Sequence, residues 1–217
     1  MIKTAEKKPV LEKIRQARLY AVTLPPGKGR DCAAMVRQAL RGGADVIQLR
    51  DKNLPALEIL DMARALKKIC AERDALFVVN DRLDIALAAG AHGVHLGQDD
   101  LPVAEARRLV QGRDFLIGCS THSLEQALKA ETDGADYIGC GPIFATPTKP
   151  DYSAQGLELI RQYRAKIRIP FVAIGGIEAS NLDQVIAAGA LCVAMVRAIF
   201  GQEDIESAAR SLKQKLV

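Results

Sequence analysis

The stretch VVNDRLDIALAAGAHGVHLGQDD, residues 78–100, contains one complete strand–helix–strand unit. An apolar run ending at Asn80-Asp81 is followed by a helical pattern over 83–89 and a second apolar run over 93–96. Both runs are continuous rather than alternating, as expected for parallel strands covered on both faces. Acidic residues follow both runs: Asp81 comes after the first, and Asp99-Asp100 come after the second. The stretch therefore predicts a β-α-β unit whose strands both end in carboxylates.

The helix-to-strand joint in this stretch recurs along the chain. Four segments share it: RGGADV (41–46), AGAHGV (89–94), DGADYI (133–138) and AGALCV (188–193). In each, a helix ends near a Gly that accepts the left-handed backbone conformation, and a small residue then leads into the next strand. The four joints predict helix-to-strand turns before strands two, four, six and eight.

Eight apolar runs are predicted as strands, with helical patterns between them. The strands are 19–23, 45–49, 76–79, 93–96, 115–118, 137–140, 171–174 and 192–196. The helices are 32–41, 55–71, 83–89, 103–111, 124–132, 156–163, 181–188 and 204–215. Eight such units predict an α/β fold, a (β/α)8 TIM barrel with an additional N-terminal helix. A doubly wound open sheet is the alternative, but no G-x-G-x-x-G follows the first strand.

No linker divides the chain, so we expect a single domain over 1–217, with a helical extension over 1–18. Whether that helix closes the far end of the barrel is left open. No tract has the roughly 18 apolar residues of a membrane span and no signal peptide is seen, so a cytoplasmic location is expected. The oligomeric state is open, with a homodimer as one expected form.

Composition narrows the class of partner. The net charge of +4 and the aromatic content of 4% argue against a nucleic-acid ligand, which needs a strongly basic surface and stacking platforms. The five cysteines are scattered and form no C-x-x-C pair, so they predict buried core residues rather than disulfides or a zinc site. Small-molecule substrates are the expected partners, with no nucleic acid and no membrane.

In a barrel of this kind the active site lies at the carboxyl ends of the strands. The polar residues that follow the predicted strands are Gln48, Arg50, Lys52, Asn80, Asp81, Gln98, Asp99, Ser120, Thr121, His122, Thr146, Thr148, Lys149 and Arg197. Solubility alone would spread such residues over the helices. Their convergence predicts a functional site at one rim of the barrel.

Two features of this rim indicate anionic ligands. Gly175-Gly176 after the seventh strand would let backbone N–H groups approach a phosphate, although a tight turn alone would also need glycine. Arg50, Lys52 and Lys149 form a second cationic group. Between those loops Asp81 and Asp99 provide two carboxylates, and Mg²⁺ is bound by such hard oxygens together with phosphate and water. Each aspartate alone is more often a turn cap than a metal ligand, but as a pair within this set they predict a magnesium site.

The three histidines give weaker signals. His92 and His95 are three apart around a strand and point to opposite faces, so they make a poor metal pair. His95 is expected to be a hydrogen-bonded core residue. His122 lies in a rim loop, where a role in proton transfer and a loop-capping role both stay open.

The strand-end motifs resemble those of the thiamine-phosphate synthase family, also called thiamine-phosphate pyrophosphorylase. The matching segments are QLRDKN, VVNDRLDIALAAGAHGVHLGQDDLP, IGCSTHS, DYIGCGPIFATPTKPD and FVAIGGI, and they fall in order at successive strand ends. The resemblance runs from about Tyr20 to Phe200. It implies a transferase of thiamine biosynthesis that joins hydroxymethylpyrimidine diphosphate to thiazole phosphate, giving thiamine phosphate and diphosphate.

The resemblance also implies roles for individual residues. Gln48 is similar to a pyrimidine-pocket residue, and Ser120 to a serine near the pyrimidine and the departing diphosphate. Diphosphate contacts are implied for Arg50, Lys52, Asn80 and Lys149, magnesium ligands for Asp81 and Asp99, and thiazole contacts for Thr146 and Thr148. The phosphate of the thiazole substrate would meet Gly176, Val196 and Arg197. Arg50, Lys52, Ser120 and Lys149 are the expected catalytic residues.

One departure from the family pattern affects the phosphate site. The eighth strand of the family usually leads into a V-S-A-I-like turn, whereas this chain has Met195-Val-Arg197-Ala-Ile. An arginine here would either add a phosphate contact or crowd the site. The segment 144–153, FATPTKPDYS, is the expected lid.

Two other functions are weighed. A thiazole tautomerase of the same fold would need neither metal nor diphosphate, so the cation and carboxylate set argues against it. A non-catalytic phosphate-ligand-binding barrel would not need cations and metal ligands placed to stabilise a departing diphosphate, so the same residue set argues against it. No serine has a histidine–carboxylate pair beside it in the sequence pattern, and ionisation of the pyrimidine methylene requires no protein nucleophile.

Overall fold

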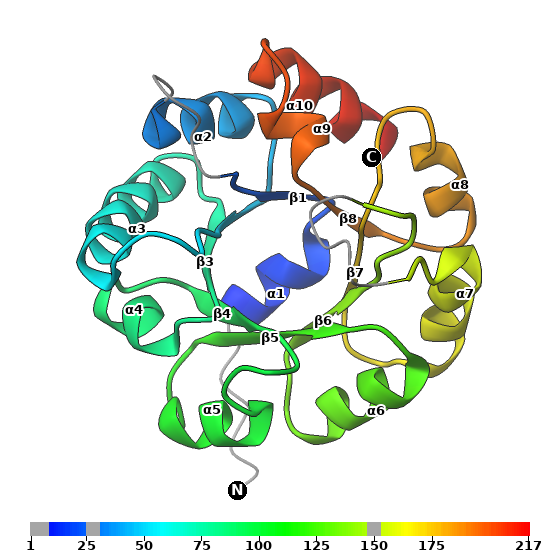
Figure 1. Ribbon diagram of the computed structural model, residues 1–217, viewed down its shortest axis with the longest axis horizontal. Coiled ribbons are helices and arrows are strands. Elements are labelled where there is room, and N and C mark those ends of the chain that lie inside the picture. Colours follow the sequence, from blue (N-terminus) through cyan, green and yellow to red (C-terminus); the bar gives the residue numbers. More distant parts are fainter. Residues whose placement is uncertain (1–8, 25–30, 147–152) are drawn as a thin grey trace, which may run out of the picture.

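Eight short parallel strands pair in chain order, and β1 pairs with β8 to close a barrel (Figure 1). This computed structural model describes residues 9–24, 31–146 and 153–217. The strands are β1 (Leu19–Val22), β2 (Val46–Leu49), β3 (Leu76–Asn80), β4 (Gly93–Leu96), β5 (Leu116–Thr121), β6 (Tyr137–Cys140), β7 (Phe171–Ile174) and β8 (Cys192–Met195). The predicted TIM barrel is confirmed, and the doubly wound alternative is wrong.

Helices form an outer ring around the strands (Figure 1). The ring consists of α2 (Cys32–Arg41), α3 (Ala56–Ala71), α4 (Leu83–Ala88), α5 (Val103–Leu109), α6 (Leu124–Thr132), α7 (Gly156–Lys166), α8 (Leu182–Ala187), α9 (Arg197–Phe200) and α10 (Ile205–Lys215). Helix α1 (Pro9–Gln16) is not part of it and appears in the centre of the view. The predicted helices lie within a few residues of these bounds. The short α9 was not predicted, because four residues are too few for a helical period to show.

The repeated glycine joints have the backbone conformation that the sequence indicates. Gly43, Gly90, Gly134 and Gly189 all have positive φ, between +65° and +110°. Each lies one residue after the last helical cap, where an L side chain would be strained. The joints therefore end α2, α4, α6 and α8 and turn the chain into the next strand.

The strands bury two separate apolar layers. Side chains on their outer face pack against the helix ring, as Phe77 and Ile117 do. Side chains on their inner face fill the barrel, and this smaller cluster includes Val46, Val78 and Leu116. Continuous apolar strands are thus required, since both faces are covered. All five cysteines are buried and unbridged, as predicted.

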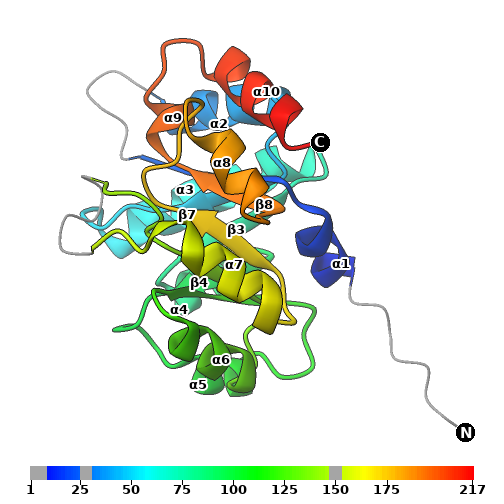
Figure 2. The same ribbon diagram turned by 90° about the vertical axis from the view of Figure 1, so that its right-hand side faces the viewer.

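Helix α1 packs against the inner cluster from the amino-terminal end of the strands. Its Ile14 is 1% exposed and belongs to that cluster. Lys13 pairs with Asp74 just before β3, and the Val10 N–H donates to Asp114 just before β5. Figure 2 shows α1 beside one end of the barrel. The helix closes the end opposite the carboxyl termini of the strands, which leaves the other end for the site.

In the described part of the chain, no helix is both long enough and apolar enough to span a membrane.

Candidate active site

A cavity of about 850 Å³ opens at the carboxyl ends of the strands. Eleven of the rim residues predicted from the sequence line it: Gln48, Arg50, Asn80, Ser120, Thr121, His122, Thr146, Gly175, Gly176, Val196 and Arg197. They come from strands or loops on all sides of the barrel. The cavity is large enough for two small substrates, since ligand pockets range over about 300–1,000 Å³.

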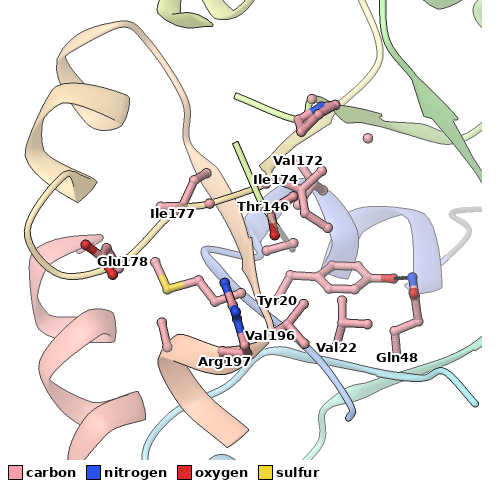
Figure 3. Close-up of a pocket in the computed structure, with 18 of the residues that line it drawn as sticks. Tyr20, Val22, Gln48, Thr146, Val172, Ile174, Ile177, Glu178, Val196 and Arg197 are labelled. Atoms are coloured by element: carbon pink, nitrogen blue, oxygen red, sulfur yellow. Dashed lines mark hydrogen bonds between the residues drawn. The ribbon is translucent and has the colours of Figure 1, made fainter. Parts of the chain in front are cut away.

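The base of the cavity is polar, although it lies in the middle of the barrel. Tyr20 and Tyr137 point inward from β1 and β6, and their hydroxyl oxygens lie 3.0 Å apart. The Gln48 side-chain amide donates to the Tyr20 oxygen over 2.8 Å, the bond drawn as a dashed line in Figure 3. His95 lies between the Tyr137 hydroxyl and Ser120, 3.2 Å and 3.0 Å from them. His95 is hydrogen-bonded, as expected, but it also lines the cavity.

Ser120 and Thr121 belong to β5 rather than to the loop after it, which corrects the strand end expected at residue 118. The apolar pattern fades at Cys119-Ser120, but pairing with β6 continues through Thr121. The extension fixes the direction of both side chains. Ser120 faces the cavity, whereas the Thr121 hydroxyl donates to the Gly139 carbonyl and is buried.

Asp81 lies at the rim directly after β3. Its φ is +62°, an unusual value for a residue other than glycine, and its N–H donates to the His95 carbonyl across to β4. Aspartate and asparagine tolerate this conformation better than most residues. The carboxylate lies 3.7 Å from the Lys52 ammonium, whose side chain is 60% exposed. Lys52 therefore reaches the rim from β2 without lining the cavity.

Asp100, rather than the predicted Asp99, is the carboxylate next to Asp81. Asp99 is exposed, whereas Asp100 is half-buried and accepts a hydrogen bond from the Gly97 N–H over 2.6 Å. Burial, a side-chain hydrogen bond with Asp100 and the negative charge of Asp100 raise the pKa of Asp81 to about 6; Lys52 and Arg50 oppose this shift. The Asp81 carboxyl therefore holds its proton to higher pH than an ordinary aspartate.

The pair fits a magnesium ion by the chemistry of its oxygens. Two facing carboxylates repel each other unless a proton or a cation lies between them. Among the described residues no group of three or more potential metal-ligating side chains occurs. Mg²⁺ commonly takes one or two carboxylates and completes its shell with water and substrate phosphate. The arrangement suits an ion that arrives with a diphosphate.

The loop after β6 packs closely on Gly175-Gly176 after β7. The Ile143 and Phe144 N–H groups donate to the Ile174 and Gly175 carbonyls, each over 2.9 Å. A Cβ on Gly176 would lie 2.7 Å from the Ala145 carbonyl oxygen. The glycine pair is therefore needed for packing, and the same turn also lines the cavity.

Two predicted residues of this loop, Thr148 and Lys149, lie outside the described residues. So does most of the expected lid, 144–153. Thr146 is described, and it faces the cavity (Figure 3).

Arg197 lies at the start of α9 and extends into the cavity from the β8 side (Figure 3). Glu178, from the loop after β7, lines the same end of the cavity. The arginine thus occupies the end where the sequence predicts a phosphate. His122 lines the cavity too, and its ring Nδ1 bonds the Gly141 carbonyl, which supports the loop-structuring role without excluding the other.

Tyr20, Tyr137 and Asp100 were missed by reasoning from the sequence. The two tyrosines stand within apolar strands, where a phenol cannot be distinguished from an ordinary core aromatic. Asp100 is adjacent to Asp99 in a turn, and spacing does not say which side chain faces β3. A signal was present for the tyrosines: a buried phenol usually finds a hydrogen-bond partner.

The fold and the site together define a class: a (β/α)8 barrel whose rim carries cations and paired carboxylates suited to phosphorylated small molecules. A family model described as thiamine monophosphate synthase matches residues 19–199. A thiamine-phosphate synthase from Methanoculleus marisnigri is 50% identical over 200 residues, covering 91% of this chain and 94% of that protein. One from Shouchella clausii is 47% identical, covering 90% and 94%.

A solved structure gives the same result. Thiamine phosphate pyrophosphorylase from Pyrococcus furiosus superposes with a TM-score of 0.86 and 39% identity, over 94% of this chain and 96% of that one. The chain belongs to the thiamine monophosphate synthase family. The family, the transferase class and the place in thiamine biosynthesis predicted from the strand-end motifs are confirmed.

Proposed function

We propose that the chain joins 4-amino-2-methyl-5-hydroxymethylpyrimidine diphosphate to 4-methyl-5-hydroxyethylthiazole phosphate, with Mg²⁺ as the cofactor. The products are thiamine phosphate and diphosphate. The observation that carries the proposal is the Asp81–Asp100 pair beside Arg50 and Lys52, at the mouth of a cavity that has a second, glycine-lined end. A polyphosphate leaving group with its Mg²⁺ is a substrate group that uses both the cations and the carboxylate pair of this rim.

In the proposed reaction the bond between the pyrimidine methylene carbon and the diphosphate oxygen breaks first, with its electrons going to diphosphate. The aminopyrimidine stabilises the resulting cation, and the thiazole nitrogen then supplies the electron pair of the new C–N bond. No protein nucleophile is required. The protein must stabilise charge on the leaving group and hold the two substrates in line.

Arg50 lines the cavity and would contact the diphosphate, and Lys52 would swing to it from Asp81, which it pairs with in the ligand-free protein. Asn80 would bind the same group, and Lys149 is expected to do so. Ser120 would donate a hydrogen bond near the bond that breaks. A bound Mg²⁺ would add charge neutralisation on the departing diphosphate, held by Asp81 and Asp100.

At the other end of the cavity, Gly176, Val196 and Arg197 would hold the thiazole phosphate, with Thr146 and Thr148 on the thiazole ring. Gln48 would bind the pyrimidine at the base of the cavity. A cytoplasmic location and a homodimer stay predictions.

The test is an assay with both substrates, with and without Mg²⁺, that follows diphosphate and thiamine phosphate together. We expect the two products in equal amounts, and only with a divalent cation. Diphosphate released without thiamine phosphate would contradict the proposal. Conversion of the thiazole tautomer with no coupled product would support the tautomerase alternative instead.

A further inference from the structure

Five side chains form a continuous hydrogen-bonded row across the barrel interior: Gln48, Tyr20, Tyr137, His95 and Ser120. The links measure 2.8, 3.0, 3.2 and 3.0 Å in that order. The row starts at the expected pyrimidine contact and ends at the serine expected beside the departing diphosphate. The row lies in the base of the cavity, and its two tyrosines, Tyr20 and Tyr137, are 2% and 0% exposed.

The fold makes room for this row at one strand position. A Cβ on Gly118 of β5 would lie 2.2 Å from Cζ of Tyr137 and 2.6 Å from Nδ1 of His95. The Tyr137 ring packs on both neighbours, with centroid distances of 6.1 Å to Tyr20 and 5.5 Å to His95. The phenols are therefore held in place by packing as well as by hydrogen bonds.

The available protons determine which residue donates and which accepts in each hydrogen bond of the row. The Gln48 amide nitrogen only donates, so the Tyr20 oxygen accepts there and its own proton must go elsewhere. Within the described residues the recorded partners of the Tyr20 hydroxyl are Gln48 and Tyr137, so Tyr20 donates to Tyr137. Tyr137 in turn donates to His95 Nδ1. With the Gln48 nitrogen donating, any other assignment leaves a buried O–H without an acceptor.

The direction determines what Ser120 can do. A His95 ring that accepts at Nδ1 is neutral and carries its proton on Nε2, which lies 3.0 Å from the Ser120 oxygen. The serine therefore accepts from His95, and its own proton points away from the ring. Since Ser120 lines the cavity, that proton can be donated to a substrate atom bound there.

We propose that Tyr20 and Tyr137 are positioning residues that fix Ser120 as a hydrogen-bond donor to the departing diphosphate. This inference rests on the proposed function. Neither tyrosine needs to touch the diphosphate or lose its proton. Burial raises the pKa of both phenols, so they stay neutral donors throughout the working pH range.

The test is a double-mutant cycle between Tyr137→Phe and Ser120→Ala, two residues that the described hydrogen bonds connect through His95. Tyr137→Phe keeps the ring but removes the hydroxyl that donates to His95 Nδ1, so His95 is no longer fixed as the donor to Ser120. We expect kcat for coupling to fall about tenfold with KM for thiazole phosphate unchanged, less than the roughly 100-fold loss from removing a whole oxyanion donor. In the Ser120→Ala background the same change should lower kcat less than twofold.

A matched control is Tyr163→Phe. Tyr163 is also fully buried, and its hydroxyl bonds Thr121 and the Ser123 carbonyl outside the barrel interior. This variant should lose thermal stability while kcat stays within twofold of the parent chain. If Tyr137→Phe likewise changed only stability, or lowered kcat equally in both serine backgrounds, the positioning role would be overturned.

A second variant tests the direction itself. Gln48→Glu replaces the donating amide nitrogen at the start of the row by a carboxylate oxygen, which accepts. Tyr20, Tyr137 and His95 would then reverse their donor and acceptor roles, and Ser120 would donate to His95. The factor by which Gln48→Glu lowers kcat should be at least threefold smaller in a Tyr20→Phe background, where the row is already interrupted. An equal loss in both backgrounds would contradict the inference. If the parent chain formed no thiamine phosphate at all, the proposed function would fail first, and the cycle would have no activity to compare.

Discussion

The Asp100 side chain of the β4–α5 loop hydrogen-bonds the Asp81 side chain of the β3–α4 turn, and the two residues follow neighbouring strands of the barrel. Burial, together with this pairing, raises the pKa of Asp81 to about 6, although Lys52 and Arg50 lie close enough to oppose the shift. A site that is strained by like charges in the metal-free protein is well suited to a divalent ion.

Asp81→Asn is predicted to stabilise the metal-free protein at pH 8. The folded-state pKa of Asp81 is raised, so its contribution to stability is present below the unfolded value near 3.8 and is lost as pH rises through about 6. Removing the charge should raise the free energy of unfolding by about 1–2 kcal/mol after solvent screening. Asparagine also tolerates the positive φ of this position.

Urea unfolding at pH 8 and at pH 4 measures this effect, and the gain should disappear at pH 4. Mg²⁺-dependent coupling should be lost in the same variant. Coupling at the parent rate would show that Asp81 holds no metal. Asp84→Asn is a control on the next exposed carboxylate and should leave coupling unchanged.

Gly118→Ala is predicted to destabilise the protein by about 1–3 kcal/mol or more, because the new methyl would overlap Tyr137 and His95. Gly139→Ala is the matched control on the neighbouring strand, since its Cβ would meet its nearest atom at an ordinary 3.5 Å. Thermal unfolding compares the two variants. Equal stability of the two variants would mean that Tyr137 and His95 can move to accommodate the added methyl group.

Arg197→Ser is predicted to raise KM for thiazole phosphate about tenfold, as expected for one lost charge-assisted hydrogen bond. KM for the pyrimidine diphosphate should not change, because Arg197 lies at the other end of the cavity from Asp81. Arg197→Lys should recover part of the loss. A lower KM in the serine variant would show instead that the arginine crowds the phosphate.

His92→Asn is predicted to make the protein less sensitive to acid. Burial and the charges of Lys67 and Lys13 lower the pKa of His92 to about 4. Its stability contribution is therefore complete above the unfolded value near 6.5 and is lost as pH falls toward 4, by on the order of 1–2 kcal/mol after screening. Asparagine can still accept from the Phe77 N–H, which bonds His92 Nδ1. Unfolding free energies at pH 7 and pH 4.5 should differ less in the variant.

The fold was predictable because each element carries a local signal. The glycines before β2, β4, β6 and β8 require positive φ, and they divide the chain into units without reference to distant contacts. Polar residues at strand ends then placed most of the site. Side-chain direction was harder to predict. Asp99 and Asp100 are adjacent, and the hydrogen bonds that Asp100 forms with the Gly97 N–H and with Asp81 depend on the folded loop.

The interior row was not predictable for a different reason. Tyr20 and Tyr137 are 117 residues apart, and their contact depends on closure of the barrel. Within each strand the sequence pattern does not distinguish a tyrosine from the other apolar residues. Long-range hydrogen bonds of this kind leave no periodic pattern in the sequence.

The most direct measurement is the anomalous scattering of Mn²⁺, as a substitute for Mg²⁺, in crystals grown with diphosphate. The account predicts one strong peak bridging the carboxylates of Asp81 and Asp100 and an oxygen of the diphosphate. A peak at Asp99, or a bound diphosphate with no metal between those two carboxylates, would contradict it.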